Sequence, residues 1–178
     1  MRRHLALPAA VLVAVLPLTA VGVAEADIQR FSDGRNDVNR TSDIHWVKID
    51  NATSNPNKVK VVVEQDELAP DLADTLQVFI NTRADHRGPE YRYTVAQDYF
   101  LTRMRSWTRP GRPVRGCQSF LGGPNYNLDR WNIAIPRDCI GNPGRVKVAV
   151  HLTRYYPHKR DTSDWAKDNR TFLPSVAR

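Results

Sequence analysis

The strongest chemical signal in this sequence is a group of five arginines that lie close together. The group comprises Arg103, Arg105, Arg109, Arg112 and Arg115, with Trp107 among them. Guanidinium groups pair with phosphate or carboxylate groups, and an aromatic face stacks on a base or a sugar ring. The group therefore predicts a surface that binds a polyanion. The competing interpretation is a solvated strand edge, because Arg outnumbers Lys along the whole chain.

Three aspartates early in the chain form a second candidate site. Asp33, Asp37 and Asp43 lie in a loop-like stretch, and carboxylate oxygens on a loop are ligands that calcium prefers. The spacing does not match the calcium loop of EF-hand proteins, and Arg35 would place a cation beside the metal. Aspartate is also a common residue of turns and caps. Two interpretations stay open, a calcium site or ordinary turn residues.

The chain contains two cysteines, Cys117 and Cys139. A single pair in an exported chain is expected to form a disulfide, which would stabilise the fold by about 3 kcal/mol in the chain-entropy model. The alternative is a catalytic thiol activated by a histidine, but neither cysteine begins a credible helix that would lower its pKa. We expect a structural disulfide.

The common motifs of enzyme chemistry are missing. The sequence contains no G-x-S-x-G, H-E-x-x-H, P-loop or G-x-G-x-x-G pattern. His45 and His151 fall at strand positions that we expect to face solvent. We expect a protein that is not an enzyme, with calcium as the one candidate ion. Because a catalytic triad needs no sequence motif, a secreted hydrolase with Asp85 and His86 as the first residues to test stays an alternative.

The first 26 residues have the pattern of an export signal. Arg2 and Arg3 precede an uncharged run, and Ala24 and Ala26 place small residues where a signal peptidase requires them, so that the mature chain begins at Asp27. A membrane anchor is the alternative, but prolines interrupt the run and no basic cluster follows it. We expect a secreted, extracellular protein with no transmembrane segment after cleavage.

The composition is that of a globular protein. The 178 residues include 26 Lys and Arg against 19 Asp and Glu, and 41% are hydrophobic. This length suits one domain, and the composition excludes disordered and collagen-like chains. Two cysteines are too few for a disulfide-rich scaffold or a four-cysteine zinc site.

The elements that must position these residues are predicted to be strands. Apolar and polar residues alternate over 58–63, 76–81, 91–96, 131–135 and 145–152, and less clearly over 99–107 and 118–121. Turn sequences rich in Gly, Pro and Asn separate these runs. The pattern predicts about eight short strands in two antiparallel sheets, a β-sandwich of the jelly-roll or immunoglobulin-like type.

Three further features complete this prediction. The alternation slips inside 44–49, between Trp46 and Val47, as a β-bulge would make it do. Residues 66–74 could hold one helical turn. We expect the sandwich domain to span 27–157. We expect 158–178 to be a loose polar tail, held to the domain at most by Trp165 and Phe172.

Several segments carry a family likeness. Asp43-Ile44, Val78-Phe79-Ile80-Asn81-Thr82-Arg83, Gly88-Pro89-Glu90-Tyr91 and Ile135-Pro136-Arg137-Asp138-Cys139-Ile140 together resemble a group of secreted actinobacterial β-sandwich proteins. The resemblance covers most of 37–172 and implies export and fold but no chemistry. A more distant similarity is to DOMON-like and carbohydrate-binding sandwiches, in which a strand ends in Asp-Thr. Here the pair is Asn81-Thr82, and the missing carboxylate removes support for an inherited metal or ligand site.

The function we expect is a non-catalytic binding module for a glycan or an anionic cell-wall polymer. Exposed aromatics such as Tyr91, Tyr93, Tyr126 or Trp107 would stack on sugar rings, and the arginines would pair with anionic groups. We expect a monomer without a specific nucleic-acid partner. Besides the hydrolase, a module that pairs with a partner through an open sheet edge stays an alternative.

Overall fold

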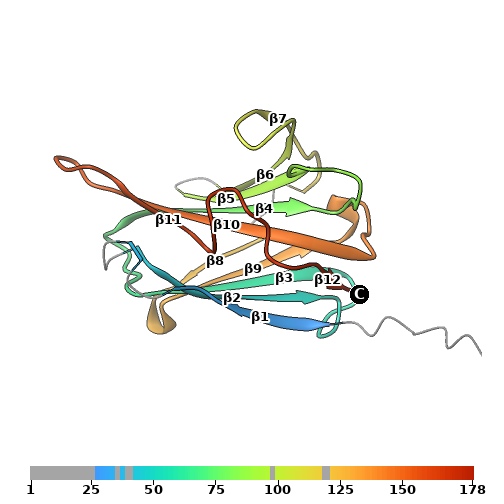
Figure 1. Cartoon of the computed structure of the whole chain (residues 1–178), viewed down its shortest axis with the longest axis horizontal. Coiled ribbons are helices and arrows are strands. Elements are labelled where there is room, and N and C mark those ends of the chain that lie inside the picture. The colour runs from blue at the N-terminus through green and yellow to red at the C-terminus, as the bar shows by residue number, and fades with distance from the viewer. Residues whose placement is uncertain (1–26, 35–36, 39–41, 97–98, 118–120) are drawn as a thin grey trace, which may run out of the picture.

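Two antiparallel sheets packed face to face make up the fold (Figure 1). The computed structural model describes residues 27–34, 37–38, 42–96, 99–117 and 121–178. The predicted signal segment, with Ala24 and Ala26, lies outside these residues, and Asp27 is the first residue described. The all-β sandwich is confirmed, with twelve strands in the described part of the chain instead of about eight.

The first sheet has the strand order β1-β2-β3-β9-β8, and the second has the order β11-β10-β4-β5-β6-β7, with β12 also paired to β10. The first contains β1 (Ile28–Ser32), β2 (Ile44–Asn51), β3 (Lys58–Gln65), β8 (Gly122–Asn125) and β9 (Arg130–Pro136). The second contains β4 (Ala73–Asn81), β5 (Tyr91–Val95), β6 (Tyr99–Met104), β7 (Pro110–Pro113), β10 (Arg145–Tyr155), β11 (Thr162–Trp165) and β12 (Val176–Ala177). The 3-10 turns η1 (Tyr126–Leu128) and η2 (Asp138–Ile140) flank β9.

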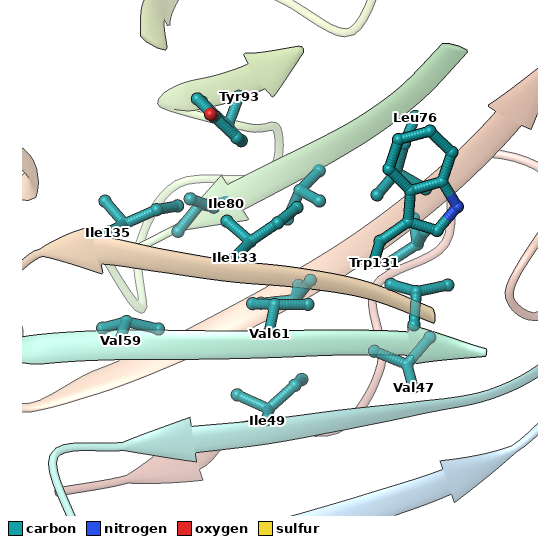
Figure 2. Packing of buried hydrophobic residues seen from close by; sticks show 14 of the residues in the cluster. Val47, Ile49, Val59, Val61, Leu76, Ile80, Tyr93, Trp131, Ile133 and Ile135 are labelled. Carbon is teal, nitrogen blue, oxygen red and sulfur yellow. The ribbon is translucent and has the colours of Figure 1, made fainter. Parts of the chain in front are cut away.

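The main hydrophobic core lies between the two sheets (Figure 2). The alternating positions of the predicted strands supply it, because every second side chain of a strand points to the same face. Figure 2 shows these side chains meeting from both layers, among them Val59, Val61, Ile80, Ile133 and Trp131. The two-residue alternation is confirmed for the long strands.

The structure differs from the prediction at three places. The bulge in β2 lies between Ile44 and Trp46, slightly earlier than expected. The segment 66–72 forms a loop and contains no helix. Within this loop, a hydrogen bond from Leu72 N to Ala69 O closes a tight turn, and β4 begins at the next residue. Of the weak candidate 118–121, only residue 121 is described, and the neighbouring strand β8 begins one residue later.

The segment 158–178, expected to be a polar tail, contributes two strands to the sheets. β11 pairs with the second half of β10, and β12 pairs with its first residues. Between them, Phe172 packs on the outer face of the second sheet, in the cluster that also holds Trp165. The segment is thus part of the folded sandwich, and strand pairing holds it in addition to the packing of Trp165 and Phe172.

Cys117 and Cys139 form the predicted disulfide, with their Cα atoms 5.9 Å apart. The bond joins the segment after β7 to η2, so it links an edge of the second sheet to the end of β9 in the first. No free thiol is left in the chain. The alternative of a catalytic cysteine is therefore wrong.

A buried ion pair joins β4 and β10 and extends into the first sheet. The side chains of Asp74 and Arg154 are each 1% exposed, and two hydrogen bonds of 2.7 and 2.8 Å connect them. Gln65 donates to Asp74 over 3.0 Å and accepts from the indole nitrogen of Trp131 over 2.6 Å. Burial alone would lower the pKa of Arg154, but hydrogen bonds and charge from Asp74 raise it. The arginine therefore stays charged.

This ion pair makes a prediction about stability. Replacing one partner, as in Asp74→Leu or Arg154→Met, leaves a buried charge without its buried counter-charge and should lower the unfolding free energy by about 3–5 kcal/mol. In Asp74→Leu the loss should lie toward the low end, because the exposed carboxylate of Glu67 stays 3.7 Å from Arg154. The double variant removes both charges and should cost much less than the sum of the single costs. Urea denaturation of the three variants and the native chain measures the difference. Strictly additive costs would show that the two charges do not depend on each other.

Candidate ligand-binding surfaces

The five arginines all lie on one structure, which we name the arginine hairpin: β6, β7, the turn between them, and Arg115 just after β7. A bond of 2.9 Å from Arg105 N to Arg109 O closes the turn. Gly111 is required in β7 because a Cβ there would lie 2.9 Å from the carbonyl oxygen of Arg103. Figure 1 shows this hairpin at the edge of the second sheet, far from the first. The side chains that the sequence placed together are thus together in space.

The arginines on this hairpin face solvent. Arg103, Arg105, Arg109, Arg112 and Arg115 are all exposed. Within the described residues, no ion pair joins any of the five to a carboxylate. The Arg103 guanidinium lies 5.6 Å from the centre of the Tyr91 ring, which holds it at the hairpin base. The hairpin therefore presents a group of cations that carboxylates of the described chain do not neutralise.

Trp107 packs against the outer face of the second sheet. Its ring packs on Phe172 and Phe79, with centroids 4.7 and 5.4 Å apart, in an outer cluster on the second sheet. This cluster buries Phe79, Met104 and Ala149 beneath Trp107, Trp165 and Phe172. Because its ring contacts this cluster, Trp107 anchors the hairpin turn to the sheet. The ring is only partly buried, so its predicted role in stacking on a ligand stays a prediction.

Two of the predicted stacking tyrosines are unavailable. Tyr91 is 8% exposed and Tyr93 is fully buried in the core, where its hydroxyl donates to Gly122 O over 3.1 Å and accepts from Leu121 N. Tyr126, in contrast, is 44% exposed in η1, at the rim of a cleft at the other end of β6. The predicted arginines and the exposed tyrosine therefore lie on different parts of the surface.

The predicted acidic site is assembled from both sheets. Carboxylate oxygens of Asp33 and Asp37 lie within 4.8 Å of one another and of Asp164 in β11. Asp43 belongs to a neighbouring group with His45 and Asp66, and it also hydrogen-bonds Asp37. Sequence reasoning missed Asp164 because it lies far along the chain, in a strand too short to show alternation. The structure thus adds a fourth carboxylate to the three that were predicted.

Contacts between the strand ends hold this group together. Ile44 N donates to Asp164 Oδ2 over 2.7 Å, and Ser42 Oγ donates to Thr162 Oγ1 over 2.8 Å, so the start of β2 is tied to β11. Asp33 Oδ1 accepts from Lys167 N over 3.1 Å. The carboxylates therefore lie where the first sheet meets the second.

Crowding and burial change the ionisation of these aspartates. Burial raises the pKa of Asp164 to about 7, and the negative charges of Asp33, Asp37 and Asp43 add to the rise. Burial is also the main reason that the pKa values of Asp33 and Asp37 are raised. A proton or a cation would relieve this repulsion.

The two histidines expected to face solvent are largely buried. The His45 side chain is 12% exposed and its Nε2 lies 2.5 Å from a carboxylate oxygen of Asp66. His151 stacks on Trp165 with ring centres 4.4 Å apart, and burial together with the charge of Arg170 lowers its pKa to about 4. Neither is a free surface residue. The alternation showed neither the carboxylate of Asp66 beside His45 nor Trp165 of the C-terminal segment on His151.

The first residues named for a hydrolase have structural partners. Asp85 pairs with Arg83 over 2.7 Å, and both side chains are exposed. His86 Nδ1 lies 2.8 Å from the carbonyl oxygen of Gly88, and Asn81 donates to the carbonyl oxygens of His86 and Gly88. These contacts shape the loop before β5.

Comparison with family models, curated proteins and solved structures finds no match for this chain. The resemblance to secreted actinobacterial sandwiches therefore stays an expectation. Among the described residues, no helix has the length and hydrophobicity that crossing a bilayer requires.

The crowded aspartates predict a pH effect on stability. The unfolded chain releases the Asp164 proton near its ordinary pKa of 3.8 and the folded chain near 7, so this group makes stability fall as pH rises from about 4 to about 7. His151 acts in the opposite direction, because its lowered pKa makes stability fall as pH drops below 6.5. The two effects must be separated by a variant.

Asp164→Asn provides this separation, because its amide oxygen can still accept from Ile44 N. In buffer with a chelator, we expect the variant to be more stable than the native chain at pH 8, by on the order of 2 kcal/mol, and the difference to vanish near pH 4. Chemical denaturation across this range measures it. A difference that does not change with pH would show that Asp164 keeps an ordinary pKa.

The calcium site stays a prediction. If calcium binds the aspartates, it binds the folded chain alone, and millimolar calcium should raise the thermal midpoint. The rise should be larger at pH 8 than at pH 5, because deprotonated carboxylates bind the ion, and smaller in Asp164→Asn. Magnesium is the matched control, since it needs a stricter geometry. Absence of both binding heat and a midpoint shift with calcium would contradict the prediction.

Proposed function

We propose that this protein is a secreted, non-catalytic module that binds an anionic glycan or cell-wall polymer through the arginine hairpin. The observation that supports it is the group of five exposed arginines on one edge hairpin, none in an ion pair with a carboxylate of the described chain. Outside a cell, the accessible polyanions are acidic glycans, cell-wall polymers and anionic lipid surfaces. We favour the polymer because the cations lie along a narrow edge.

The shape of the hairpin suits a linear ligand. β6 and β7 pair Thr102 with Pro113 and Met104 with Pro110, so Arg103 and Arg112 lie on neighbouring strands while Arg105 and Arg109 flank the turn. Trp107 fixes the turn on the outer cluster, which reduces the conformational freedom that binding would otherwise remove. Each guanidinium can donate two parallel hydrogen bonds to a phosphate or carboxylate group.

A pull-down tests this proposal. We expect purified peptidoglycan carrying its anionic polymers to retain the protein at low salt and to release it as salt screens the charges. Arg105→Glu with Arg109→Glu should abolish most of the retention. Both side chains are exposed, so the fold should survive the change.

The matched control is Lys159→Glu with Arg160→Glu, which makes the same change of net charge in an exposed turn at the end of β10. We expect this control to keep most of the retention. Equal loss in both variants would mean that net charge alone attracts the polymer, and unchanged retention in the hairpin variant would reject the hairpin as the contact. Cleavage of a generic ester, peptide or glycoside substrate would instead support the hydrolase.

A further inference from the structure

A cleft of about 600 Å³ opens at the end of the sandwich, between the two sheets. The loop 68–72 and the start of β4 form one wall, and the ends of β5 and β10 and the start of β6 contribute Val95, Tyr155, Tyr99 and Phe100. Tyr126 of η1 and Trp131 of β9 come from the other sheet. Figure 1 shows the turn between β8 and β9 and the β10–β11 hairpin at the same end of the molecule. Volumes of this size are typical of ligand sites.

The cleft is held in shape by buried polar contacts. Trp131 is 3% exposed, and its indole nitrogen donates to Gln65, which in turn donates to Asp74 of the buried ion pair. Asp129 joins the two rims, because its carboxylate accepts from Leu68 N over 2.9 Å and its backbone oxygen accepts from Gln65 N over 3.1 Å. A site built in this way needs little reorganisation to bind.

The lining is aromatic but open to water. Tyr126 is 44% exposed and Tyr155 is 49% exposed, and they are two of the four exposed large hydrophobic side chains in the described residues. Each ring offers an apolar face beside a hydroxyl group that can donate and accept hydrogen bonds. A ligand with apolar faces and many hydroxyl groups fits this combination better than a purely apolar one.

The charges that line the cleft disfavour an anionic ligand. Among the residues that the structure describes, no Lys, Arg or His lines it, and the nearby Arg154 is paired with Asp74. Asp71 lines it with an exposed carboxylate, which would repel an anion and accept hydrogen bonds from hydroxyl groups. The cleft therefore differs in chemistry from the arginine hairpin. β6 connects the two surfaces, because its first residues line the cleft and its last residues belong to the hairpin.

A shallow hollow continues from the cleft on the far side of Tyr126. Asn125, Asn127 and Asn132 line it, and none of the described residues that line it is charged. β8 runs so close to β9 here that a Cβ at Gly122 would lie 2.0 Å from Asn132 O, and the φ of +114° also requires glycine. Amide side chains donate and accept hydrogen bonds, so the hollow extends the polar, uncharged path. The ligand that fits both hollows is elongated.

We infer that this end cleft is a second binding site, and that it binds a neutral oligosaccharide with one sugar ring against Tyr126 and Tyr155. The aromatic faces contact the apolar face of the ring, Asp71 accepts from its hydroxyl groups, and the asparagines contact the next ring along the chain. A fatty chain would leave these polar groups without partners, which is costly in a binding site. The inference does not depend on the arginine hairpin.

Titration of the full protein followed by NMR tests the inference. The probes are chitotetraose, cellotetraose and mannotetraose, each to millimolar concentration. We expect at least one of them to shift the amide signals of Tyr126, Asn127 and Tyr155 and the indole N–H signal of Trp131, in a saturable way. Tyr126→Ala and Tyr155→Ala should each weaken binding about tenfold, the size of a lost aromatic contact.

Leu128→Ala is the matched control, because Leu128 is 52% exposed in the same turn as Tyr126 but does not line the cleft. It should change the affinity less than twofold, as should the double hairpin variant Arg105→Glu with Arg109→Glu. No saturable shift at the cleft with any of the three tetramers would overturn the inference. Binding of octanol in the cleft without binding of any tetramer would overturn it as well.

Discussion

The buried ion pair between Asp74 and Arg154 is the constraint on which the rest of the structure depends. The two residues lie directly opposite each other on β4 and β10. A shift of one strand by one residue would turn its charged side chain to the opposite face and leave the other charge buried without this partner. Gln65 and Trp131 extend the contact into the first sheet. The pair therefore sets the alignment of the longest strand pair and helps to set how the two sheets meet. Hydrophobic packing alone is less directional, because it tolerates small slides.

The same polar contacts shape the cleft that we propose as a ligand site. At this end of the sandwich, the side chains of Trp131, Asp74 and Arg154 are held by hydrogen bonds. They line or lie beside the cleft, and they keep it open by holding its inner wall in place. Beyond the other end of β6, Trp107 holds the arginine hairpin in place, because its ring packs on Phe79 and Phe172. Each proposed surface is thus carried by side chains that are themselves held by packing or by hydrogen bonds.

Much of the fold could be predicted from the sequence, because long strands with one buried face leave a two-residue pattern. Val59, Val61 and Val63 show it, and so do Val146, Val148 and Val150. The strands β7 and β8 could not be found in this way, since Gly and Pro dominate them and their pairing is decided by neighbouring strands. The pairing of Cys117 with Cys139 needed only the count of cysteines and the expected export.

The sites were harder to predict because they combine residues from distant parts of the chain. The arginines are neighbours in sequence and were found, but the role of Trp107 depends on a cluster that Phe172 completes from the C-terminal segment. Asp164 joins Asp33 and Asp37 only after β11 has paired with β10. Tyr126 and Tyr155 come from different sheets, and no local pattern relates them.

The central structural claim is that the buried polar contacts hold the end cleft preformed for a neutral oligosaccharide. The most direct measurement of it is a crystal structure with a neutral tetrasaccharide bound. The account predicts a sugar ring between Tyr126 and Tyr155, with the Trp131–Gln65 and Asp74–Arg154 contacts unchanged from the free protein. Sugar bound only elsewhere on the surface, or a cleft that must break these contacts to admit it, would contradict the account.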